Sequence, residues 1–109
     1  MTTNPLWRSQ AEIDQPYSRH ASFTFTTTLD TAQNALSLTS RMAECHKVSF
    51  IVDLNDLYIE FDGNATTSTM LSPAGTGYFD EKIFFSSRIS VINAVAGLNG
   101  RIRGIAWGR

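Results

Sequence analysis

The chain has 109 residues, 42% of them hydrophobic, and a single cysteine, which suits one domain with its own core and rules out an intrachain disulfide. Its net charge of −1, from nine basic and ten acidic residues, argues against a nucleic-acid-binding protein, and no apolar segment is long enough to span a membrane. Residues 1–20 contain no apolar run of the kind found in signal peptides, so we expect the protein to be made and assembled in the cytoplasm.

Residues 1–20 are predicted to form an extended N-terminal arm. Pro5 and Pro16 each restrict the preceding residue to extended conformations. The arm also carries four large apolar side chains, Leu6, Trp7, Ile13 and Tyr17. Because side chains of this kind are rare in disordered tails, we expect them to order against a protein partner.

From residue 21 onward, apolar and polar residues alternate with the period of two that is typical of half-buried strands. The first half of the domain contains three such segments, 23–29, 35–42 and 44–53, and a turn is expected at residues 30–34. In the third segment, Val48 and Phe50 face one side and Ile51 faces the other. These segments predict strands.

The second half of the chain contains three more predicted strands, at 57–62, 82–95 and 101–109. Residues 54–57 are short enough for a hairpin, Asn99-Gly100 is a strong hairpin signal, and residues 64–81 suggest a long excursion. Six or seven short strands with frequent turns predict an all-β domain over residues 21–109. The expected fold is a single antiparallel β-sandwich or a jelly-roll-like domain.

Glu60 and Asp62 raise the question of catalysis, because the predicted alternation places both carboxylates on one strand face. Glycosidases use such pairs, but neighbouring carboxylates are common on solvated sheet faces. A calcium loop starting at Asp53 fails because Leu57 stands at the third ligand position, and the Gly-Thr-Gly at 75–77 lacks the lysine of a phosphate-binding loop.

Few other residues suggest chemistry. Cys45 and His46 are adjacent, so on a strand they point to opposite faces, and we expect Cys45 to be a buried apolar residue. The only other histidine is His20. We therefore expect no catalytic residue, no cofactor and no metal site.

Three arginines on the last predicted strand, Arg101, Arg103 and Arg109, form a candidate basic cluster. Two interpretations remain open. In the first, these are solvated charges opposite Glu60 or Asp62 on a neighbouring strand. In the second, they form part of a subunit interface.

The region from Val48 to Arg109 resembles small virion proteins of tailed bacteriophages. The resemblance rests on five segments in succession: HKVSFIVD, LYIEFDGNATT, MLSPAGTGY, ISVINAVAG and GRIRGIAWGR. These motifs come from turns and the core, and they carry no chemistry. Proteins of this kind are similar to β-sandwich capsid decoration (cement) proteins, or to neck and tail accessory proteins, so the resemblance implies assembly without catalysis.

The expected function is therefore that of a capsid decoration protein located in the virion, which binds the major capsid protein or another virion protein. A homo-oligomer is expected, with a trimer as the best guess, because a small sandwich must pair or cover its sheet edges. We expect no binding to nucleic acid or membrane. Alternatives are a neck, tail or fibre-base component, or a carbohydrate-binding module that uses Tyr58, Tyr78 or Trp107 beside Glu60 and Asp62.

Overall fold

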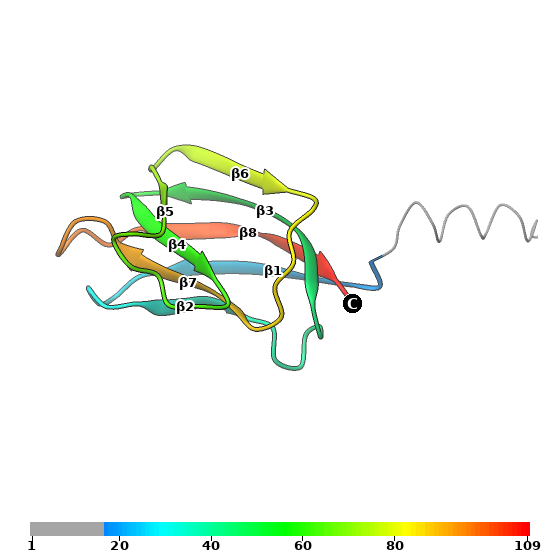
Figure 1. The fold of residues 1–109 in the computed structure, drawn as a ribbon. Coiled ribbons are helices and arrows are strands. Elements are labelled where there is room, and N and C mark those ends of the chain that lie inside the picture. The colour runs from blue at the N-terminus through cyan, green and yellow to red at the C-terminus, as the bar shows by residue number, and fades with distance from the viewer. Residues whose placement is uncertain (1–16) are drawn as a thin grey trace, which may run out of the picture.

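The protein folds into two packed four-stranded antiparallel sheets, as a computed structural model shows for residues 17–109 (Figure 1). Residues 1–16, which include Leu6, Trp7 and Ile13 of the expected arm, lie outside the described residues. The strands are β1 (Arg19–Thr26), β2 (Gln33–Ser37), β3 (Cys45–Asp53), β4 (Leu57–Phe61), β5 (Met70–Ser72), β6 (Thr76–Asp80), β7 (Arg88–Asn93) and β8 (Arg101–Gly108). The prediction of an all-β sandwich is confirmed.

The strand order within the sheets is that of a jelly roll. One sheet has the order β1-β8-β3-β6 and the other has the order β2-β7-β4-β5. Only β4 and β5 are neighbours both in sequence and within a sheet, so every other connection crosses from one sheet to the other. Eight strands connected in this way form the double-sheet architecture of jelly rolls.

The core lies between the two sheets and follows the predicted alternation. Val48, Phe50 and Val52 of β3 are buried, and so are Ile89 and Val91 of β7. They meet Leu36, Leu38, Leu57, Ile59, Phe85, Ile102 and Ala106. The inward positions of alternating strands therefore supply one continuous apolar layer, as expected for a sandwich.

Both hairpins expected from the sequence are wrong. β3 and β4 belong to different sheets, and so do β7 and β8, so residues 54–56 and 94–100 are crossovers between layers. Glycine is required at position 100 because the two crossovers pass close to each other there. A Cβ on Gly100 would lie 2.5 Å from the carbonyl oxygen of Asn55. Short crossovers use the same turn residues as hairpins, and the turn residues at these two positions therefore wrongly predicted hairpins.

The segment 64–81 is also more regular than expected, because it contains β5 and β6. The strand predicted at 57–62 ends at Phe61, and Asp62 adopts a left-handed conformation with φ of 66°. Gly75, with φ of 87°, makes the turn between β5 and β6. Both positions demand a conformation that few residues other than Gly, Asn and Asp adopt.

A small polar network is buried where β1 and β7 end. The Thr27 hydroxyl lies against the Asn93 side chain and accepts a hydrogen bond from the Gly100 amide. The Asn93 amide in turn donates to Asp30 and Asn99. The network joins the β1–β2 and β7–β8 connections, and a satisfied buried network of this kind rigidifies its surroundings.

The central strand β8 generates the first prediction. Gly104 pairs with Phe23 on one side and with Phe50 on the other, and a Cβ on it would lie 2.1 Å from the Ser49 carbonyl oxygen and 2.6 Å from the Phe50 Cβ. We expect Gly104→Ala to destabilise the protein by about 3 kcal/mol because the backbone must move. Gly77→Ala is the matched control, since its closest contact is at 3.6 Å. Urea unfolding measures both, and equal midpoints for the two variants would contradict the prediction.

Candidate functional site: an aromatic-basic sheet face and an aliphatic loop end

The outer face of the sheet β1-β8-β3-β6 carries apolar and cationic side chains where a solvated face would be polar. We call this surface the aromatic-basic face and define it by Lys47, Ile51, Phe79, Arg103, Ile105 and Trp107. Ile51 is 40% exposed and Phe79 is 58% exposed. Strand alternation places these residues together because outward positions of β8, β3 and β6 are cross-strand neighbours.

Lys47 lies between the two aromatic rings of this face. Its ammonium nitrogen is 4.7 Å from the centre of the Trp107 ring and 5.6 Å from that of the Phe79 ring. Both distances are within the range of cation–π attraction. The three side chains therefore hold one another in place across β8, β3 and β6.

At the other end of β8, two arginines share one carboxylate. Arg101 makes a two-pronged ion pair with Asp53 at 2.8 and 2.9 Å, and Arg103 reaches the same carboxylate at 3.1 Å. The hydrogen bond from Arg101 holds the pKa of the Asp53 carboxyl below its ordinary value, with a smaller contribution from Arg103. The two arginines and the one aspartate together carry a net positive charge, and their hydrogen bonds hold the three side chains in a fixed geometry.

An open hollow of about 420 Å³ lies on this face. Its lining comes from β3, β6 and β8 and includes Ile51, Arg103, Ile105 and Trp107. Gly77 contributes no side chain beside Ile51, with which it is paired. An apolar group flanked by an acidic one fits a hollow with this lining.

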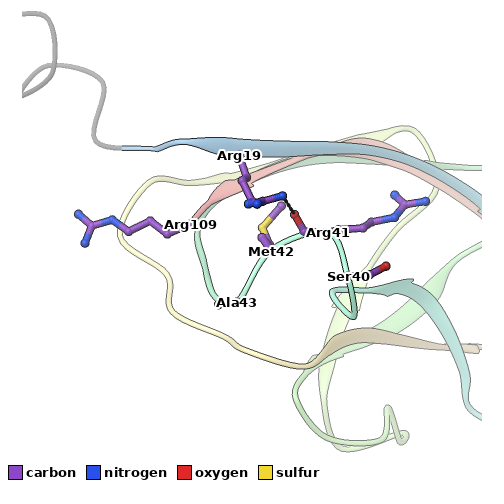
Figure 2. A pocket seen from close by; sticks show the side chains of 6 residues that line it. All are labelled: Arg19, Ser40, Arg41, Met42, Ala43 and Arg109. Atoms are coloured by element: carbon purple, nitrogen blue, oxygen red, sulfur yellow. Dashed lines mark hydrogen bonds between the residues drawn. The ribbon is translucent and has the colours of Figure 1, made fainter.

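The basic cluster expected from the sequence is only partly correct. Arg101 and Arg103 lie together, but Arg109 follows the opposite end of β8. There it lines a second hollow of about 350 Å³ with Arg19, Ser40, Arg41, Met42 and Ala43. Figure 2 shows that its side chain points away from Arg19, whose guanidinium donates to the Arg41 carbonyl at 3.5 Å.

The partners proposed for the arginines are also wrong. Glu60 belongs to β4 in the other sheet, and Asp62 follows that strand, whereas the arginines pair with Asp53 on β3. The Asp62 carboxylate instead accepts hydrogen bonds from the amides of Ser86 and Ser87, the closest at 2.6 Å. It anchors the β6–β7 connection, which is a structural task.

A second unusual surface, the aliphatic loop end, lies at the end of the sandwich opposite the C-terminus (Figure 1). We define it by Leu29, Leu54, Val95 and Leu98, which are 57%, 58%, 55% and 47% exposed. Leu54, Val95 and Leu98 line one hollow of about 130 Å³. Leu29 joins this end because its carbonyl accepts a hydrogen bond from Asn93. The alternation of apolar and polar residues does not reveal this surface, because its residues come from separate connections.

The aromatic set proposed for sugar binding is not brought together. Tyr78 packs inward against Phe50, with ring centres 5.1 Å apart, whereas Tyr58 lies on β4 in the other sheet and Trp107 lies on the aromatic-basic face. Tyr17, the one described residue among the four apolar residues of the expected arm, stacks on His46 with ring centres 6.2 Å apart.

Other candidate groups for chemistry are occupied or dispersed. Cys45 is fully buried, and desolvation raises the pKa of its thiol. The Nε2 atom of His46 lies 3.2 Å from the Oε1 atom of the Glu44 carboxylate. Within residues 17–109, no three His, Cys, Asp or Glu side chains are placed to hold a metal ion. The same described part of the chain contains no helix long and apolar enough to cross a membrane.

Asp62 gives a stability prediction that separates structure from catalysis. We expect Asp62→Ala to lower the free energy of unfolding by about 2 kcal/mol, because several amides lose a charged acceptor and alanine disfavours the left-handed conformation. Glu60→Gln, the control, should change it by less than about 0.5 kcal/mol. Chemical denaturation measures both. A hydrolytic activity lost in Glu60→Gln without loss of stability would show that the pair is catalytic instead.

Asp53 gives a pH prediction. Because its folded-state pKa is lowered, its ion pairs stabilise the fold above the unfolded-state pKa of about 4 and are lost as the pH falls through the lower folded value. Asp53→Asn should therefore be less stable than the wild type at pH 7, and the difference should shrink towards pH 2. Urea midpoints across this range test it, with Glu81→Gln as a control for removing one exposed carboxylate. An unchanged difference would contradict the assignment.

No protein-family model, curated protein or solved structure matches the chain in the comparisons made. The function proposed below therefore rests on the chain's own surfaces and on the sequence motifs of residues 48–109.

Proposed function

We propose that the protein is a non-enzymatic structural component of a bacteriophage virion, a capsid decoration protein that stabilises the head through contacts between subunits. The phage assignment comes from the resemblance in the sequence motifs of residues 48–109. The jelly roll is compatible with it, since viral capsid proteins use this architecture, but so do lectins and other proteins.

The observation that carries an assembly role is the amount of large apolar surface left outside the core. Eight large apolar residues, Leu29, Ile51, Leu54, Leu71, Phe79, Phe84, Val95 and Leu98, are at least 40% exposed. Six of them fall on the aromatic-basic face or the aliphatic loop end. Concentrated apolar surface of this kind marks sites that are covered in an assembly.

A carbohydrate-binding module is the second candidate, and one observation favours it. The rings of Trp107 and Phe79 lie on the same sheet face, flanking Lys47, and aromatic rings on a flat face can support a sugar. The cation over the rings opposes this function, because it occupies the ring faces that a sugar would need. Binding on a glycan array that is lost in Trp107→Ala would favour this candidate over the virion role.

The virion role is tested by co-sedimentation of the full chain with heads assembled from the major capsid protein of the same phage. A chain lacking residues 1–16 should stay folded, because β1 begins at Arg19 and Tyr17 keeps its contact with His46. It should bind the heads at least about 30-fold more weakly, because Trp7 is lost and tryptophan is a frequent interface anchor.

Trp7→Ala should cause part of the same loss, and Thr3→Ala, in the same segment, should cause none. Circular dichroism shows whether each variant retains its β structure. If the shortened and full chains bind heads equally well, residues 1–16 do not contribute to binding. No binding of the full chain to heads would remove the decoration role itself.

A further inference from the structure

We propose that the aliphatic loop end of one copy docks on the aromatic-basic face of a second copy. This inference rests on the proposed function, because a decoration protein that works by linking subunits is expected to be a homo-oligomer. It names the two surfaces that would form the contact between copies.

The loop end has the chemistry of one half of such an interface. The four connections at this end, residues 27–32, 54–56, 73–75 and 94–100, contain no lysine or arginine and two carboxylates, Asp30 and Asp56. Both aspartates are exposed. The surface is therefore an aliphatic centre with acidic neighbours, and the depletion of charge at its centre is typical of interfaces.

The loop end is also held rigidly, which lowers the entropic cost of binding. Asp30 accepts hydrogen bonds from the Gly97 amide at 2.8 Å and from the Asn93 side chain at 2.9 Å. Asn55 donates to the Asn99 carbonyl at 2.8 Å, and Asp56 accepts from the Ala74 amide at 2.7 Å. Each of the connections is thereby tied to a neighbour.

The aromatic-basic face has the opposite character. It presents Ile51, Phe79 and Trp107 together with the cations Lys47 and Arg103. Arg101, which directly follows the loop end, is balanced by its ion pair with Asp53. The face is therefore apolar and net cationic. Its open hollow of about 420 Å³ could receive an aliphatic side chain.

Charge decides between the possible pairings. Two aromatic-basic faces packed against each other would bring like cations together, and two loop ends would bring like carboxylates together; like charges across an interface are unfavourable. Only the loop end against the face pairs opposite charges while burying apolar surface on both sides.

The two surfaces point in different directions on one copy. The loop end lies at the ends of the strands, and the aromatic-basic face lies along their side (Figure 1). Each copy can therefore use its loop end on one neighbour and its face for another. Contacts of this head-to-side kind close into rings when the rotation between copies allows it, and the expected trimer is one such ring.

The test uses two exposed residues, one on each surface, in the full chain. Leu98→Arg places a cation on the loop end, where it would meet the cationic face, and Phe79→Asp places a carboxylate on the face, where it would meet the acidic loop end. Leu71→Arg is the matched control: Leu71 is a leucine with the same 47% exposure as Leu98, but it lies on β5 in the other sheet. Light scattering after size-exclusion chromatography gives the mass, and circular dichroism confirms the β fold.

We expect the wild type and Leu71→Arg to form the same oligomer. Leu98→Arg and Phe79→Asp should each associate at least about 30-fold more weakly, because each loses an interface anchor and places like charges across the contact. A 1:1 mixture of these two variants should associate more tightly than either alone, because the intact face of one can receive the intact loop end of the other. A contact between like surfaces gives no such rescue.

The inference is overturned if the wild type is a monomer, if either variant keeps the wild-type oligomer, or if the mixture associates no better than the separate variants. These outcomes are distinct from failure of the proposed function, which is read from head co-sedimentation. An oligomer that survives both substitutions and still binds heads would leave the decoration role standing and place the contact elsewhere.

Discussion

The strand β8 can lie between β1 and β3 because three of its four inward positions carry glycine or alanine. Gly104 and Gly108 leave no room for a Cβ, and Ala106 is fully buried between them. Atoms of Ser49 and Phe50 occupy the space that a side chain at Gly104 would take, and backbone atoms of Glu44 and Cys45 do the same at Gly108. Because β8 is paired on both sides along its length, its outward residues Arg101, Arg103, Ile105 and Trp107 are held in a fixed row.

Four aspartates of the domain, one of them in the pair that suggested catalysis, are used to build the fold. Asp30 and Asp56 fix loops, Asp62 anchors the β6–β7 connection, and Asp53 orders two arginines. What the domain offers outward is apolar surface at one sheet face and one end. The proposed role, binding other proteins, would use this exposed apolar surface. The charges near it would then determine which partner is bound.

The sequence allowed the fold class and most strands to be predicted, because alternation reports which side chains face the core. β3 and β8 were predicted almost to the residue, and Ile51 was correctly placed opposite the buried residues of β3. Neighbours within a sheet could not be predicted in the same way. Residues 54–56 and Asn99-Gly100 have the composition of hairpin turns, yet they connect strands in different sheets.

The candidate surfaces were hidden for the same reason. Alternation along β8 places Arg103, Ile105 and Trp107 on one side, but it does not reveal that Lys47 and Phe79 lie beside them. The assignment of Glu60 and Asp62 as partners of the arginines failed because it assumed the wrong neighbouring strand. The loop end depends on connections that are distant in sequence and meet only in the folded domain.

The pairing of β1 with β8 has a consequence for how the chain reaches its native state. Arg19 pairs with Gly108, so among the described strands the first, β1, has the last, β8, as its sheet neighbour. During synthesis, the sheet that carries the aromatic-basic face stays incomplete until β8 has left the ribosome. Contacts between such distant residues make folding slow. Newly made chains therefore pass through a period in which β1 and β3 lack their shared partner, and the aromatic-basic face is complete only after this period ends.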